Sequence, residues 1–109
     1  MADGRMWTVR DRHGNDVYLS DERWHHITEP INHPDMVHFM AELQETIRYG
    51  HRKQDLLNPQ KYRYSRAFNS LDDDNTHIVA IVLCRFRESE SGHPEPNNYM
   101  VTSYQKEIG

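Results

Sequence analysis

The sequence has almost no cysteine and no long apolar run. Cys84 is the only cysteine among 109 residues, so no disulfide can form within the chain and nothing indicates secretion. The longest apolar run, residues 78–84, is far too short to cross a bilayer. Residues 1–8 hold no apolar stretch of the kind found in signal peptides. These absences predict a cytoplasmic protein without a membrane segment.

Glycine is also scarce, and the few glycines stand singly. The sequence therefore lacks a glycine-rich loop for cradling phosphates, and it has no G-x-S-x-G turn of the hydrolase type. Cys84 lies in the most apolar segment, where a thiol behaves as a small hydrophobe. We interpret it as a buried, unreactive residue.

Charge is unevenly distributed along a chain whose length predicts one domain, residues 1–109. The formal net charge is −4, which counts against a nucleic-acid binder. Residues 48–66, however, hold six basic residues and one acidic residue, Asp55, so this segment carries +5. It is either a solvated charged surface or a local anion site.

The first half of the chain predicts a hairpin followed by two helices. Residues 7–9 and 17–19 flank a Gly14-Asn15 turn signal, and Ser20 is typical of a helix N-cap. That helix should end near Thr28, before Pro30. A second helix is predicted from Pro34 to Gly50, because a Met-rich stripe of core residues recurs there at helical spacing.

The second half predicts strands. Residues 51–60 are expected to form a loop, 61–68 an amphipathic strand, 69–75 a turn and 77–86 a central strand covered on both faces. A polar loop follows at 88–98, then a last strand at 99–104 and a short tail at 106–109. The order favours an α+β fold, with the hairpin and two helices packed on a mostly antiparallel sheet of about four strands.

Eight histidines raise the question of a metal site. His25 and His26 are adjacent, so they point about 100° apart on a helix, and Pro30 separates them from His33. We therefore expect neither a metal nor another cofactor. Metal-free cleavage of RNA needs a base, an acid and cations around the phosphate. His26, the basic residues between Arg52 and Arg66, and Thr102 or Ser103 are the candidates for that chemistry.

Short motifs at both ends resemble a known group. D-R-H-G at 11–14, Y-L-S-D-E-R-W-H-H-I at 18–27 and H-P-D-M at 33–36 are similar to the opening of small bacterial and phage-associated proteins. Y-M-V-T-S-Y at 99–104 resembles their closing strand. Those proteins are similar to the barnase–EndoU–colicin–RelE (BECR) nucleases, a group that includes many toxin domains. The resemblance implies helices packed on a four-stranded antiparallel sheet.

The resemblance also implies roles for individual residues. His26 matches the helix histidine, the general base or acid, and Thr102 matches the hydroxyl of the closing strand. The basic residue of the first sheet strand falls on Arg63 or Arg66. Further contacts to RNA would come from Arg52, Lys53 and Lys61. Ser103 replaces an alanine of the pattern and adds a second candidate hydroxyl.

Three hypotheses remain open at this stage. The first is a metal-independent endoribonuclease of toxin type, whose partners would be RNA and an antitoxin or immunity protein. The second is a catalytically inactive binding or regulatory domain on the same fold, favoured by the net acidity, which opposes RNA binding. The third is a metalloprotein that uses the histidines. No membrane partner is expected.

Overall fold

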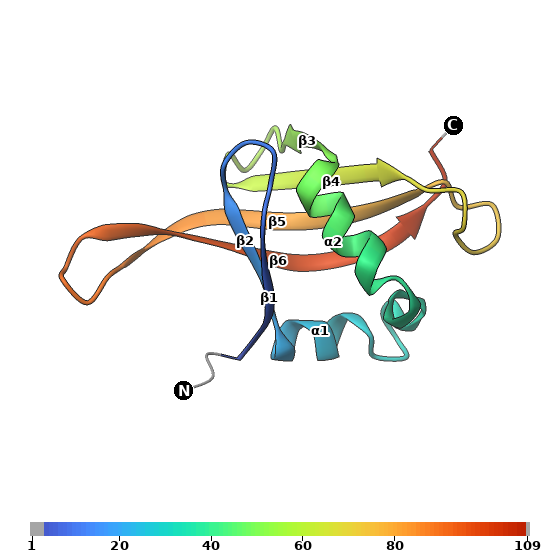
Figure 1. Cartoon of the computed structure of the whole chain (residues 1–109), viewed down its shortest axis with the longest axis horizontal. Helices are drawn as coiled ribbons and strands as arrows, with labels where there is room; N and C mark the ends of the chain where they lie inside the picture. Colours follow the sequence, from blue (N-terminus) through green and yellow to red (C-terminus); the bar gives the residue numbers. More distant parts are fainter. Residues whose placement is uncertain (1–3, 109) are drawn as a thin grey trace.

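Six strands of the computed structural model form one mixed sheet, in the order β1-β2-β6-β5-β4-β3 (Figure 1). Their bounds are β1 Arg5–Arg10, β2 Asp16–Ser20, β3 His51–Gln54, β4 Lys61–Ala67, β5 His77–Glu88 and β6 Pro94–Lys106. Every neighbouring pair is antiparallel except β2 and β6. The structure describes residues 4–108. The start of the segment considered for a signal peptide, residues 1–3, and the end of the predicted tail, Gly109, lie outside the described residues.

One helix crosses a face of the sheet and two shorter helical segments lie beside β6 (Figure 1). They are α1 Asp21–Ile27, the 3-10 helix Pro34–His38 and α2 Met40–Tyr49. Each contributes to a single apolar core, which also takes side chains from β1, β2, β4, β5 and β6. The largest fully buried members include Leu19, Ile27, Met36, Leu43, Ile47, Tyr64, Ile78 and Met100. The predicted α+β class is therefore confirmed, and no helix of the described residues is long and apolar enough to span a membrane.

The predicted hairpin and first helix are both present. β1 and β2 pair in antiparallel fashion around a turn in which Gly14 adopts a φ of +85°, a conformation that suits glycine. The Ser20 hydroxyl accepts a hydrogen bond from the backbone N–H of Arg23 at 3.0 Å, as an N-cap does. Thr28 ends α1. These elements are specified by local residue chemistry, which explains why the sequence predicts them.

The predicted second helix is two segments instead of one. Phe39 leaves the helical conformation, with φ −124° and ψ 28°, between the 3-10 helix and α2. Met36 and Phe39, on either side of the break, are both buried in the core. Gly50 does end α2, although its φ of −69° is not left-handed.

The sheet corrects the prediction of about four mostly antiparallel strands. His51–Gln54, expected to be loop, pairs with β4 as an edge strand, and its polar sequence gives no apolar alternation by which to recognise it. The hairpin is part of the same sheet, because Val17 and Tyr18 of β2 pair in parallel with Asn98 and Tyr99 of β6. Five of the eleven residues of the predicted loop 88–98 belong to β6, so β5 and β6 project together as a long arm (Figure 1).

The second face of the sheet, which we call the open face, is covered by none of the described helices. β5 alternates between the two faces: Ile78, Ala80 and Val82 belong to the core, whereas Ile81 is half-buried on the open face. Val79 is nevertheless fully buried on that face, so the predicted covering of this strand on both sides is met only in part. A mixed apolar and polar surface remains accessible there.

Candidate functional site

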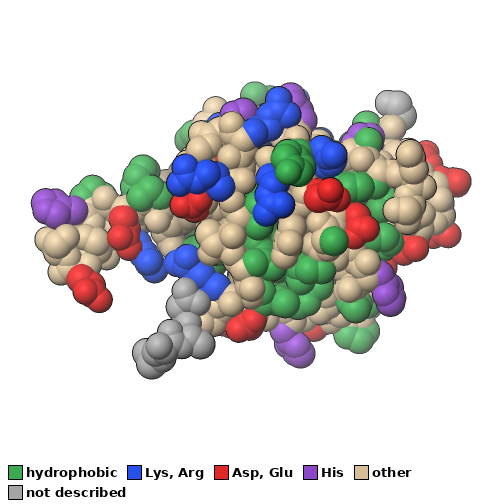
Figure 2. All heavy atoms as spheres, in the orientation of Figure 1, with side chains coloured by type: hydrophobic (Ala, Val, Ile, Leu, Met, Phe, Trp, Pro, Cys, Tyr) green, Lys and Arg blue, Asp and Glu red, His purple; other side chains and the backbone are tan. Residues whose placement is uncertain are grey.

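Basic side chains gather where β3 and β4 lie side by side. Figure 2, which draws the helix-bearing face, shows several Lys and Arg side chains over this region. Several acidic side chains gather at one end of the molecule, around the turn between β4 and β5, where residues 72–74 are exposed aspartates. The local charge surplus of residues 48–66 is thus concentrated in space as well as in sequence.

The open face has a hollow of about 460 Å³ at this basic end. It lies between the β3–β4 turn and the sheet. Three basic residues and one acidic residue line it, together with Gln54 and three apolar residues: Lys53, Lys61, Arg63, Asp55, Leu56, Leu57 and Ile81. The two leucines are 93% and 96% exposed, which is unusual for consecutive large apolar residues. The hollow therefore combines cations with unburied apolar surface.

The strand register places four residues in one row across the open face. Lys53 pairs with Arg63, Arg63 with Ile81, and Ile81 with Thr102. Neighbouring strands lie about 4.8 Å apart, so the backbone of Thr102 lies about 10 Å from that of Arg63. Among the predicted catalytic residues, Arg63 and Thr102 thus share a face, beside the predicted substrate-binding residues Lys53 and Lys61.

Arg66 lies on the opposite, helix-bearing face. It is three residues beyond Arg63 on the same strand, and side chains on a strand alternate between faces. Its guanidinium carbon lies 5.3 Å from the ring centre of Tyr49 and 5.7 Å from that of Phe68. The sheet itself therefore separates Arg63 from Arg66, and one phosphate cannot contact both.

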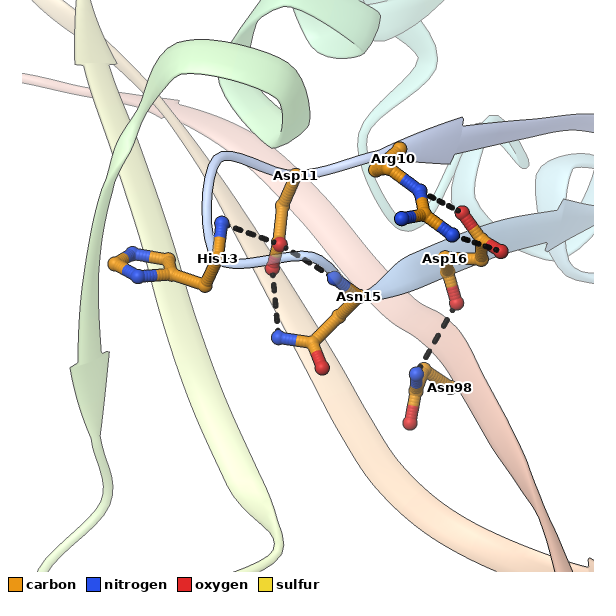
Figure 3. A network of polar contacts seen from close by, with 6 residues as sticks. All are labelled: Arg10, Asp11, His13, Asn15, Asp16 and Asn98. Atoms are coloured by element: carbon orange, nitrogen blue, oxygen red, sulfur yellow. Dashed lines mark hydrogen bonds and ion pairs between the residues drawn. The ribbon is translucent and has the colours of Figure 1, made fainter.

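Arg52 also lies on the helix-bearing face, over the Tyr62 ring and beside a buried acid. Its guanidinium is 3.9 Å from the Asp11 carboxylate, which is fully buried. Asp11 accepts hydrogen bonds from the backbone N–H groups of His13 and Asn15, both at 2.8 Å, and from the Asn15 amide (Figure 3). It also accepts one from the Tyr64 hydroxyl. This network attaches the hairpin turn to β4.

The Asp11 network shifts the pKa values of its members. Burial alone would raise the pKa of Asp11, but hydrogen bonds from Tyr64, Asn15 and His13 outweigh it and hold that pKa below its ordinary value. Burial, and then the hydrogen bond to Asp11, raises the pKa of Tyr64 far above its usual value. Burial likewise raises the pKa of the Cys84 thiol, although the residue is half-buried instead of fully buried as predicted. Arg52 is thus part of a structural network.

Ser103 lies in the core instead of at a surface. It is fully buried opposite Ala80, and its hydroxyl has no hydrogen-bond partner. An extra residue of β6 is inserted just before Thr102, at the point where the register with β5 shifts. Thr102 therefore lies on the open face and Ser103 on the helix-bearing face. Of the two predicted hydroxyls, only that of Thr102 is half-exposed.

His26 lies in a different hollow, on the surface of α1. Its imidazole is exposed, and Nδ1 is 3.7 Å from the Glu29 carboxylate. The same hollow is lined by Ser20, Glu22, Arg23 and His25, and none of the strand residues predicted to bind phosphate takes part in it. The structure thus does not bring His26 into one hollow with Arg63 or Lys53.

The remaining histidines do not form a cluster. The imidazole of His33 stacks against Tyr104, with ring centres 5.5 Å apart. Within residues 4–108, no group of three His, Cys, Asp or Glu side chains is arranged to hold a metal ion. The histidine side chains therefore serve as surface and packing groups in this structure.

Sequence reasoning missed two parts of this site. The sequence predicts only a loop for the segment that contains Leu56 and Leu57. Two adjacent leucines in a polar segment already indicate a surface for apolar contact with a ligand. The role of Asp11 could not be predicted, because its partners Tyr64 and Arg52 are distant in sequence. Comparison with known protein families, with curated proteins and with solved structures finds no match for this chain.

Proposed function

We propose that the chain is a non-catalytic binding domain that takes an acidic, leucine-containing segment of a partner protein in the hollow of its open face. One observation carries the proposal. Lys53 and Arg63 stand opposite each other on neighbouring strands, and neither forms an ion pair within residues 4–108. Like charges directly opposite in a sheet are destabilising, and a carboxylate between them would remove that cost.

Lys61 differs from these two cations because it already has an acidic neighbour. Its ammonium lies 3.9 Å from the Asp55 carboxylate, and both groups remain partly exposed. Lys61 thus borders the hollow with much of its charge compensated. An incoming acidic segment would contact Lys53 and Arg63 first.

The exposed leucines favour a protein over RNA as the ligand. Leu56 and Leu57 stand at the mouth of the hollow, where contact with an apolar side chain would remove them from water. Full burial of a leucine side chain contributes about 1.5–3 kcal/mol, an energy that a phosphate backbone cannot supply.

The positions of the predicted catalytic groups support binding over cleavage. A general base must reach the proton that it removes, and cations must surround the same phosphate. His26 lines a separate hollow with acidic neighbours, Arg66 lies behind the sheet, and Ser103 is buried. Arg63 and Thr102 alone share a face, and neither is a base at neutral pH.

Fluorescence anisotropy with two labelled probes tests the proposal. The first probe is the peptide Glu-Asp-Glu-Leu-Leu-Glu-Asp-Glu, and the second is a single-stranded oligouridylate. We expect the peptide to bind and the RNA to remain uncleaved. The double variant Lys53→Glu/Arg63→Glu should bind the peptide at least about tenfold more weakly, a loss of about 1.4 kcal/mol.

The control is Arg23→Glu/Lys106→Glu, which changes the net charge equally but lies outside the hollow. It should retain most of the peptide affinity. Equal losses of peptide affinity in both double variants would mean that binding depends only on net charge. The proposed site in the hollow would then be wrong. RNA cleavage that disappears in His26→Ala would instead establish the nuclease.

A further inference from the structure

β3 leaves one edge of the sheet free. It is the last strand in the order, and β4 is the only strand with which it pairs among the described residues. The backbone N–H of Asp55 donates to the carbonyl of Lys61 at 2.9 Å. Hydrogen-bonded pairs alternate along an antiparallel ladder, so Lys53 also bonds to β4 while Arg52 and Gln54 do not. The N–H and C=O groups of Arg52 and Gln54 therefore point away from the sheet.

Basic side chains lie on both sides of this edge. On the open face they are Lys53 and Arg63, and on the helix-bearing face they are Arg52 and Arg66. Asp11 is the acid beside Arg52, and its carboxylate already accepts four hydrogen bonds. A strand added at β3 would send alternate side chains to the two faces. Carboxylates on the open face would find Lys53 and Arg63, whereas on the helix-bearing face Arg52 already lies 3.9 Å from the Asp11 carboxylate.

A second copy of this chain does not fit the same edge. Two β3 strands placed side by side would bring His51, Arg52 and Lys53 of one copy against those of the other. Short edge strands with basic side chains are a common protection against such pairing. The same charges attract an acidic strand, so the edge favours a partner strand of negative charge.

We infer that the free edge of β3 takes an extended acidic segment of a partner protein as an additional strand. This inference rests on the proposed function and specifies how the segment binds. Backbone hydrogen bonds to Arg52 and Gln54 hold the segment in an extended form, and Lys53 and Arg63 on the open face contact its carboxylates. Leu56 and Leu57 follow directly at the end of β3 and receive its apolar side chains.

Gln54 allows a matched test. Gln54→Pro removes the outward N–H without removing a hydrogen bond to β4, and proline is tolerated on edge strands. Gln54→Ala keeps the N–H and loses only the side chain, whose amide donates to the carbonyl of Pro59 at 2.8 Å. We expect Gln54→Pro to bind the Glu-Asp-Glu-Leu-Leu-Glu-Asp-Glu peptide at least about tenfold more weakly than Gln54→Ala.

Hydrogen exchange of the unmodified protein provides a second measurement, which does not depend on how the proline variant folds. Addition of the peptide should slow exchange of the Arg52 and Gln54 amides. Equal affinity of the two variants, or unchanged exchange at Arg52 and Gln54 in saturating peptide, would overturn strand addition while the proposed function stands. A peptide that does not bind the unmodified protein at all would overturn the proposed function itself.

Discussion

Asp11 shows how one buried residue connects distant parts of the chain. It is 4% exposed and accepts hydrogen bonds from the hairpin turn and from Tyr64 of β4. Removal of a buried acceptor leaves its donors without partners. The free energy lost in this way exceeds what the hydrogen bonds themselves contribute to stability. At the residue scale, Asp11 is therefore where the fold is most sensitive to a polar substitution.

Asp11→Ala should lower the free energy of unfolding by about 3 kcal/mol at neutral pH. Asp16→Ala is the control, because Asp16 forms an exposed ion pair with Arg10 and such pairs contribute about 0–1 kcal/mol. Urea denaturation of both variants measures the difference. Similar losses in the two variants would contradict the role of Asp11.

The same residue predicts a pH dependence. The folded-state pKa of Asp11 is below its ordinary value of about 3.9, so on acidification the unfolded chain takes up the proton first. The stabilisation is present above that ordinary value and is lost as the pH falls through the folded-state pKa. The stability difference between the unmodified protein and Asp11→Ala should therefore narrow below about pH 4 in urea titrations. A difference that stays constant down to pH 2 would contradict it.

At the scale of elements, the end of α2 determines where β3 begins. Arg12 of the hairpin turn donates to the Tyr49 carbonyl at 3.2 Å, which places a cation at the negative end of the helix dipole. Gly50 then leads directly into β3. Its φ of −69° suits any residue, so glycine is required there for space.

Gly50→Ala should destabilise the protein by about 2–3 kcal/mol, the cost of overpacking. An added Cβ would lie 2.2 Å from the Thr46 carbonyl oxygen and 2.9 Å from that of Ser65, and both are backbone atoms. Gly14→Ala is the comparison, because nothing lies within 4 Å of its Cβ and only its φ of +85° is strained, at about 1 kcal/mol. Chemical denaturation should rank Gly50→Ala as the more severe change, and the reverse order would contradict the packing argument.

The whole molecule is an elongated body with its charges separated. It measures 49 Å along its longest axis, with the β5–β6 arm at one end and the acidic β4–β5 turn at the other. The basic β3–β4 region lies away from that turn (Figure 1). An acidic ligand therefore approaches a molecule that repels it at one end and attracts it elsewhere.

Asp73→Asn/Asp74→Asn should speed association of the acidic peptide about twofold at low ionic strength. These residues are exposed and form no ion pair within the described part of the chain, and asparagine tolerates the φ of 50° at Asp73. Stopped-flow kinetics should show an unchanged dissociation rate, and the gain should vanish at high salt, where charges this far apart are screened. A change confined to the dissociation rate would contradict long-range repulsion.

The sequence by itself determined the local elements. Ser20 as an N-cap, the Gly14 turn and the alternation of β4 all follow from residue chemistry within a few positions. The spacing of Arg63 and Arg66 even placed them on opposite faces once the strand was recognised. The surplus of positive charge in residues 48–66 also follows from the sequence alone.

Only the tertiary structure decided which residues meet. The parallel pairing of β2 with β6, the edge strand His51–Gln54 and the break at Phe39 depend on contacts between distant segments, which no local pattern encodes. The inserted residue of β6 placed Thr102 on the open face and Ser103 in the core. No described helix covers the open face, so the basic residues of β3 and β4 line an accessible hollow there. The same basic segment also forms the last strand of the sheet, whose outer edge is free among the described strands.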